Sequence, residues 1–319
     1  MVELILSDSS NGKKKTSKRK INWSEYNESL VRRGEMLFDA GFLQNWRAEL
    51  KKMNKGKEGA NYHYPNSLIL LLATVHAYLL PYRQLEGFLR TMSKHIKKLQ
   101  EMVPDFTTIW WRVVKMKINL DPKINLERDD IVIAVDSTGI KVTNRGEWIV
   151  DKWKKKRKRK GFVKIHVAVN IKTKKIVSME VTKENIHDGK MLKKLVDDVG
   201  SKNNSIKKIL ADGAYDSKDN FKYLDELKIT PGIKVRKNSS IKNNINCIPR
   251  KLSVLEQFKD MKRWKKKHRY GMRWIVESVF SSIKRTFGEH VSSVKWNNIV
   301  NELMLKASIY NTFIEKTIL

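Results

Sequence analysis

Hydrophobic and polar positions divide the chain into two parts with different periods. From Trp23 to about Leu120, apolar residues recur at the spacing of helices. Residues 68–80 are apolar almost all round, which predicts a buried helix. Pro81 and Pro104 each begin a further helical run, since proline is tolerated in the first helical turn. We therefore predict an all-α N-terminal region. Its short, tightly joined helices suit either a helix-turn-helix or an ordinary helical bundle.

The pattern changes near residue 129, where β-branched runs begin. The expected elements are a strand over 131–135, two strands within 162–181, a helix over 188–199, a strand over 208–211, a helix over 218–227 and a strand over 229–235. Strands followed by alternating strands and helices predict a mixed central sheet of the α/β class. Residues 238–249 are expected to form a loop, and helices over about 266–287 and 298–315 close the chain.

Charge points to a polyanionic partner. Sixty-six Lys and Arg against 34 Asp and Glu give a net charge of +32. Nucleic acid explains such an excess best, while an acidic membrane surface and a general lysine bias stay open. The longest apolar run, residues 68–80, is shorter than the roughly 20 residues that cross a bilayer, so no membrane span is expected. The single cysteine, Cys247, indicates a reducing, cytoplasmic compartment.

Two carboxylates follow apolar strands directly. Asp136 comes after the 131–135 run and Asp212 after residues 209–211, so we expect each at the C-terminal end of a buried strand. Taken singly, such a residue is more often a turn residue or a helix cap. Together they favour a metal site, because burial penalises unpaired carboxylates and a divalent cation removes that penalty.

A third acidic residue lies on the predicted helix over 266–287. At 100° per residue, Tyr270, Arg273, Glu277 and Lys284 fall within about 60° of one another. The apolar residues expected on the buried side are Ile275, Val276, Val279, Phe280, Ile283 and Phe287. A solvated face with pairs such as Arg273 and Glu277 is one interpretation. The other is a phosphate-binding stripe that carries one metal ligand.

These residues resemble a known signature. The spacing of Tyr270, Arg273, Glu277 and Lys284, together with the segments 135–139 (VDSTG) and 211–216 (ADGAYD), is similar to that of insertion-sequence transposases of the type-four and type-five families. Residues 64–68 and 82–86 make the type-five family the closer match. The resemblance runs from Trp23 to the C-terminus. It implies a DNA-binding helical region over 23–120 and a ribonuclease-H-like catalytic domain over 121–319. The polar, lysine-rich residues 7–20 before it predict a flexible basic arm over 1–22.

The resemblance also implies a chemistry. An acidic triad (DDE) of Asp136, Asp212 and Glu277 would hold two Mg²⁺, with Mn²⁺ able to substitute and Asp136 bridging both ions. Tyr270, Arg273 and Lys284 would hold the phosphates of the element end. The enzyme would cut DNA at the ends of its insertion sequence and transfer the 3′-hydroxyls to target DNA. Because an element has two ends, a homodimer is expected in the active complex. The protein is expected to associate with the nucleoid and to use no small-molecule substrate.

Two basic tracts fit DNA contact less specifically. Residues 152–160 hold eight basic residues in nine around Trp153, and residues 259–269 hold seven in eleven around Trp264. Aromatic side chains among cations suit stacking on bases beside phosphate contacts. A solvated hairpin tip is the other interpretation of the first tract. The expected DNA contacts are Lys154, Lys156, Arg157, Arg159, Lys265 and Arg269.

Further polar residues are expected near the site, namely Lys164, His166, His187 and Asp188. A core histidine bonded to a backbone carbonyl explains His166 equally well, and Asp188 suits a helix N-cap. Two other functions stay open: a metal-dependent nuclease that cuts without joining, and a non-catalytic DNA-binding repressor derived from an element. The presence of all three acidic residues argues against the repressor.

Overall fold

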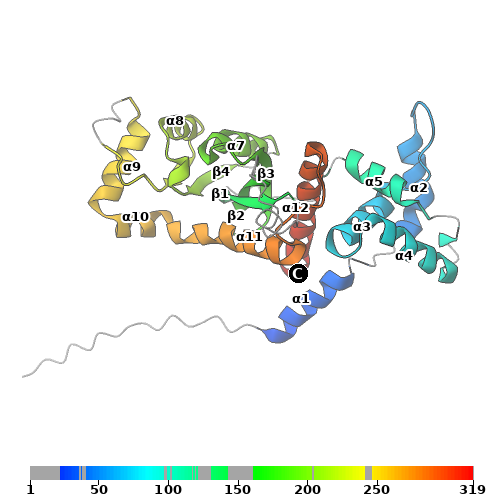
Figure 1. The fold of residues 1–319 in the computed structure, drawn as a ribbon. Coiled ribbons are helices and arrows are strands. Elements are labelled where there is room, and N and C mark those ends of the chain that lie inside the picture. The colour runs from blue at the N-terminus through cyan, green and yellow to red at the C-terminus, as the bar shows by residue number, and fades with distance from the viewer. Residues whose placement is uncertain are drawn as a thin grey trace, which may run out of the picture.

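The computed structural model describes residues 22–35, 37, 41–96, 99–100, 103–116, 118, 120, 131–142, 161–202, 205–240 and 246–318 (Figure 1). The basic tract over 152–160 and residues 1–21 of the expected arm lie outside these ranges. Within them, every helix is too short or too polar to cross a membrane.

The N-terminal region is helical, as predicted. Its helices are α1 (Trp23–Glu35), α2 (Phe42–Asn54), α3 (Asn66–Tyr78), α4 (Tyr82–His95) and α5 (Phe106–Lys115). Helix α5 begins where the carboxylate of Asp105 accepts hydrogen bonds from the backbone N–H groups of Thr107 and Thr108. Helix α3 is the apolar segment predicted to be buried, and six of its residues are buried.

A five-stranded mixed sheet forms the second part of the molecule. Its strands are β1 (Ile131–Lys141), β2 (Phe162–Asn170), β3 (Ile176–Lys183), β4 (Ile206–Ala211) and β5 (Thr230–Ile233). Their order is β3-β2-β1-β4-β5. Strands β1 to β3 pair antiparallel, whereas β4 lies parallel to both β1 and β5. The mixed α/β sheet and the ribonuclease-H-like arrangement are therefore confirmed.

Helices cover both faces of this sheet. One face, called the α7 face here, packs against α7 (Leu192–Ser201), α8 (Lys218–Glu226) and α9 (Ile248–Lys259). The other, the α11 face, packs against α11 (Trp274–Phe287) and α12 (Trp296–Ile318). In Figure 1, α12 stands between the sheet and helices α2 to α5. Buried residues of the N-terminal helices thereby share one hydrophobic core with α11, α12 and the sheet.

The single helix predicted over 266–287 is wrong. Helix α10 (Met261–His268) ends at Arg269, whose left-handed backbone (φ 50°) cannot continue a right-handed helix. A 3₁₀ turn, η6 (Tyr270–Arg273), follows, and α11 begins at Trp274. The six residues predicted on the buried side of α11 are all buried.

Helix α9 was not predicted. Its residues Ile248, Leu252 and Leu255 are apolar but exposed, so the chain lacks a clear division between an apolar and a polar face there. The start of this helix also overlaps the predicted loop over 238–249.

Candidate active site

Asp136 and Asp212 come from neighbouring parallel strands. Ala134 of β1 pairs with Leu210 of β4, and continuing this register by two residues places Asp212 opposite Asp136. Asp212 follows the last residue of β4, as predicted. Asp136 does not end its strand, which corrects the prediction, because β2 pairs with β1 as far as Lys141. The two aspartates therefore lie where β4 stops and β1 continues with one strand neighbour fewer.

The pleat of β1 decides which face of the sheet each side chain occupies. Ala134 and Ile140 belong to the core beneath α11, whereas Ile133 and Val135 belong to the core beneath α7. Because alternate residues share a face, Asp136 points to the α11 face. Helix α11 lies across that face through its buried apolar side, and Glu277 extends from it.

Arg273 joins two of the three acidic residues. Its Nη1 donates to Oδ2 of Asp136 at 2.8 Å, and its Nη2 forms an ion pair with Glu277. The i,i+4 pair considered from the sequence thus forms, and it extends to a carboxylate 137 residues away. Burial lowers the pKa of Arg273, but Asp136, Tyr270 and Glu277 raise it above its ordinary value. This guanidinium is therefore a fixed cation between strand and helix.

The surroundings of Asp136 oppose its negative charge. Burial raises the pKa of Asp136, and the nearby charge of Asp212 raises it further. The backbone N–H of Ser137, at 2.9 Å, and Arg273 act in the opposite direction. Two carboxylates thus compete for compensation at one point of the sheet. A cation of higher charge would relieve this repulsion more than one guanidinium does.

An open pocket of about 570 Å³ lies over the carboxylates of Asp136 and Glu277. It is lined by Asp136, Ser137, Thr138, Glu277, Phe280, Ser281, Lys284, Arg285 and Glu289. Carboxylate oxygens suit Mg²⁺, so the chemistry of the donors fits this ion. In the part of the chain that the structure describes, no three His, Cys, Asp or Glu side chains are gathered closely enough to hold a metal. Oxygens of Asp136 and Glu277 bind Arg273 instead.

Asp212 also caps a turn. Its Oδ1 accepts a hydrogen bond from the N–H of Ala214 at 2.8 Å, at the start of the 3₁₀ turn η4 (Gly213–Tyr215). The cap interpretation of this aspartate is thus correct as local structure, and it leaves the second carboxylate oxygen for another partner. Tyr270 donates from its hydroxyl to the carbonyl oxygen of Ala211 at 3.3 Å, which ties η6 to the end of β4.

Comparison with known proteins identifies the family. Residues 127–312 match a protein family described as Transposase DDE domain, and this match covers more than half of the chain. The chain belongs to this transposase family. A second family with the same description matches residues 31–145. The type-five assignment stays a prediction.

One solved structure similar to the transposase is a cryo-EM structure of the piggyBac transposase synaptic complex with hairpin DNA. It shares 11% sequence identity, has a TM-score of 0.38, and the alignment covers 92% of this chain and 76% of that chain.

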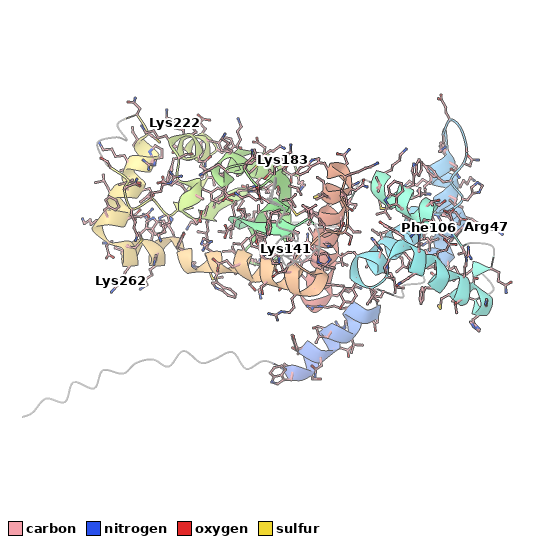
Figure 2. All side chains as sticks on the ribbon, in the orientation of Figure 1. Arg47, Phe106, Lys141, Lys183, Lys222 and Lys262 are labelled. Carbon is pink, nitrogen blue, oxygen red and sulfur yellow. The ribbon has the colours of Figure 1, made fainter. Side chains whose placement is uncertain are left out.

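Membership of this family implies that the transposase binds DNA, and cations surround the site. Lys284 lines the carboxylate pocket, while Lys265 and Arg269 are exposed on α10 and just after it. Figure 2 shows that labelled basic residues such as Lys141 and Lys262 lie on separate elements of the sheet-containing part. Lys154, Lys156, Arg157 and Arg159 lie outside the described residues.

Trp264 is not available to DNA, which corrects one prediction. Its side chain is fully buried and packs against Tyr270, with ring centroids 5.0 Å apart. The cations around it are exposed because α10 turns only this residue and His268 inward. Stacking of a base on Trp264 is therefore excluded in this fold.

A second polar cluster lies on the α7 face. Nζ of Lys164 donates to Oδ1 of Asp188 at 2.8 Å, and the ring of buried His166 contacts Thr182 Oγ1 at 2.8 Å. The cap expected of Asp188 is wrong, because His187 caps the turn η3 (Asp188–Met191). His166 is a core histidine, as the alternative held, but its partner is a hydroxyl and not a backbone carbonyl. Burial lowers the pKa of His166 to about 4, so its ring is neutral at pH 7.

Sequence reasoning missed Asp216 and Arg250. Nε and Nη2 of Arg250 donate to the two carboxylate oxygens of Asp216 at 2.6 and 2.9 Å, and the backbone N–H of Arg236 donates to the same carboxylate. Asp216 is buried, so this bidentate pair anchors α9 to the turn after β4. The available signal was the second aspartate of the segment 212–216 (DGAYD).

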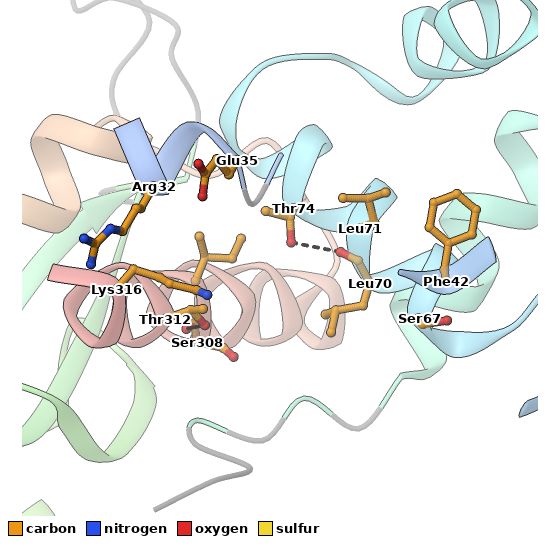
Figure 3. Close-up of a pocket in the computed structure, with 11 residues that line it drawn as sticks. Arg32, Glu35, Phe42, Ser67, Leu70, Leu71, Thr74, Ser308, Thr312 and Lys316 are labelled. Carbon is orange, nitrogen blue, oxygen red and sulfur yellow. Dashed lines mark hydrogen bonds between the residues drawn. The ribbon is translucent and has the colours of Figure 1, made fainter. Parts of the chain in front are cut away.

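A pocket of about 530 Å³ lies away from the carboxylates, between α1, α3 and α12 (Figure 3). Among the residues that line this pocket, the hydroxyl of Thr74 donates to the carbonyl oxygen of Leu70 in the same helix at 2.9 Å. Arg32, Glu35 and Lys316 are the charged residues of its lining. With one acidic residue in its lining, this pocket does not offer the paired carboxylates that metal-dependent phosphate chemistry requires.

Proposed function

We propose that this transposase binds the ends of its own insertion sequence, cuts phosphodiester bonds there and transfers the 3′-hydroxyls to target DNA. The observation that carries this proposal is that Asp136 of β1 and Glu277 of α11 both pair with Arg273, while the charge of Asp212, at the end of β4, acts on both Asp136 and Arg273. These elements are far apart in sequence, and the sheet register and helix packing bring their carboxylates to one side of the sheet.

The three carboxylates would hold two Mg²⁺ or Mn²⁺ ions. When bound, two such ions activate the attacking water or 3′-hydroxyl and neutralise charge on the leaving oxygen. Asp136 lies opposite Asp212 in the continued sheet register and shares Arg273 with Glu277, which supports its assignment as the shared ligand. Asp212 and Glu277 would complete one ion each. The repulsion that raises the pKa of Asp136 would then be offset by a divalent charge.

Cationic side chains of the same region would hold the DNA. Arg273 holds its planar guanidinium against Asp136 and Glu277, and Lys284 lines the carboxylate pocket; both side chains suit phosphate oxygens. Tyr270 contributes by fixing the carbonyl of Ala211, which precedes Asp212. Lys265 and Arg269 extend the basic surface along α10.

The helical region over 23–120 would bind the element end beside the catalytic domain over 121–319. Trp110 and Trp111 of α5 are exposed, and Nζ of Lys115 lies 4.0 Å from the ring centroid of Trp111. An exposed aromatic surface with a cation suits nucleic acid. Since an element has two ends, we propose a homodimer as the active complex, associated with the nucleoid through DNA.

The decisive test is incubation of the protein with DNA that carries its two flanking ends, in Mg²⁺ or Mn²⁺, followed by mapping of cuts and joints. Wild-type protein is expected to cut at the element boundary and to join pre-cut 3′-hydroxyl ends to a plasmid. Cutting without joining would indicate the nuclease. Binding without cutting would indicate the DNA-binding repressor.

The matched control for this assay is Asp198→Asn. Asp198 pairs with Lys202 at the exposed end of α7, away from the carboxylate pocket. This variant should cut and join like the wild type.

The homodimer has its own test. Light scattering of the complex with end DNA should give a total mass that, after the mass of the DNA is subtracted, corresponds to two protein chains. A complex with one chain that still joins both ends would overturn the dimer and leave the chemistry intact.

A further inference from the structure

Asp188 is held rigidly on the α7 face of the sheet. Its carboxylate accepts from Nζ of Lys164 and forms a hydrogen bond with the side chain of Ser137. Lys164 is fixed in turn, because it also donates to the carbonyl oxygen of Ile186 at 3.1 Å. Burial raises the pKa of Asp188, but the bonds from Lys164 and Ser137 lower it below its ordinary value. The carboxylate is therefore ionised at neutral pH with these acceptor positions occupied.

Ser137 connects Asp188 to Asp136. Its backbone N–H donates to Oδ1 of Asp136 at 2.9 Å, and its side chain turns to the opposite face of β1. A bond that fixes the Ser137 side chain therefore also fixes the peptide group that holds the Asp136 carboxylate.

The turn that Asp188 begins is in direct contact with the turn that Asp212 caps. A Cβ on Gly189 would lie 2.8 Å from the carbonyl oxygen of Ala214, so η3 approaches η4 as closely as a glycine allows. The side chain of Asn220 bridges both turns, since its Nδ2 donates to the carbonyl oxygens of Gly189 and Tyr215. Asp188 is thus connected to both aspartates of the active site.

We propose that Asp188 is a positioning residue that sets the spacing between Asp136 and Asp212, by holding Ser137 on one side and the η3 turn against η4 on the other. This proposal rests on the proposed function of the carboxylates. It differs from a role as a fourth metal ligand, because Asp188 occupies the other face of β1 and uses its oxygens for Lys164 and Ser137.

The test is a double-mutant cycle with Asp188→Asn and Ser137→Ala, read as single-turnover cleavage of pre-bound end DNA in Mn²⁺. Each single variant should lower the rate constant about tenfold, and the double variant should be no slower than Asp188→Asn, because both remove the same connection. The Mn²⁺ concentration for half-maximal rate should rise in each. The Kd for end DNA should stay unchanged, which separates positioning from loss of binding.

Two controls keep the result interpretable. Ser137→Thr retains the hydroxyl and should recover most of the rate that Ser137→Ala loses. Asp198→Asn removes an aspartate of the neighbouring helix and should match the wild type. If Asp188→Asn unfolds, the comparison of Ser137→Ala with Ser137→Thr tests the same connection.

Each other outcome overturns a definite statement. Wild-type rates in Asp188→Asn, or independent losses that multiply in the double variant, would exclude the positioning role. Loss of cleavage in Asp188→Asn with wild-type rates in Ser137→Ala would show that Asp188 acts directly on the ions or DNA. Equal rates in Ser137→Ala and Ser137→Thr would exclude a role of the hydroxyl. A wild-type protein that does not cleave its ends would instead refute the proposed function.

Discussion

The two faces of β1 carry polar clusters of opposite character. On the α11 face, Asp136 and Glu277 meet Arg273 in an open pocket, and the side chain of Glu277 is 56% exposed. On the α7 face, Asp188, Lys164 and buried His166 are packed among strands and η3, where the side chain of Asp188 is 23% exposed. The first cluster is therefore accessible to a ligand through its pocket, and the second is fixed by its own contacts.

The contrast teaches how a stable sheet supports a reactive site. Carboxylates that must bind and release a ligand repel one another while no ligand is bound, so they contribute little to stability. Charges that are paired inside the fold stabilise it against substitution of either partner, because removing one partner leaves the other buried and uncompensated. The following substitutions test this division, from the largest expected effect to the smallest.

Asp136→Asn should abolish chemistry without unfolding the protein. The variant removes a ligand charge and also the repulsion with Asp212. We expect cleavage to fall on the order of 10³-fold or more, with stability within about 1 kcal/mol of the wild type. Gel assays of end cleavage and urea unfolding measure the two quantities. Persistent cleavage would refute the assignment of Asp136 as a metal ligand.

Asp216→Asn should show the reverse balance. It breaks the buried bidentate pair with Arg250, and we expect a loss of about 3 to 5 kcal/mol in unfolding free energy. Asp212→Asn, four residues earlier, is the matched variant and should retain stability while losing cleavage. Chemical denaturation of both variants, followed by circular dichroism, gives the comparison. Equal unfolding free energies of the two variants would show that Asp212 and Asp216 do not differ in their contribution to stability.

Acidification should destabilise the protein through His166, which lies on the α7 face. Its folded pKa of about 4 lies below the ordinary value of 6.5, so the unfolded chain binds more protons between these pH values. Stability from this group is complete above pH 6.5 and is lost as the pH falls toward 4, by up to about 3 kcal/mol. His166→Gln should flatten this dependence in urea unfolding at pH 7, 6 and 5. An unchanged slope would mean that other groups dominate.

Arg273→Gln should change which cations the carboxylates of the α11 face bind. Without the guanidinium, Asp136 and Glu277 lose their cation, so Mn²⁺ should bind the DNA-free protein severalfold more tightly in calorimetry. The same variant should bind end DNA about tenfold more weakly, because one phosphate contact is lost. Lys222→Gln on α8, at the opposite face of the sheet, serves as a charge-matched control. Weaker Mn²⁺ binding in Arg273→Gln would contradict this account.

Short-range patterns were sufficient for most of the architecture. The run over 131–135, the strand pair over 162–181 and the buried side of α11 follow from residue types at fixed local spacing. The break at Arg269 could not be predicted, because a positive φ at an arginine depends on the packing of Trp264 and Tyr270 around it. The same packing buries Trp264, whose neighbours in sequence are almost all charged.

The sequence by itself determined which chemical groups this protein can use: three acidic residues, an arginine and a lysine at fixed spacing, and a large positive charge. Only the tertiary structure decided which groups meet. The 76-residue offset between β1 and β4 in the parallel register matches the separation of Asp136 and Asp212, and Arg273 reaches Asp136 from the start of α11. Such contacts depend on strand register and helix packing, which arise from the cooperative burial of residues distant in sequence and not from any local pattern.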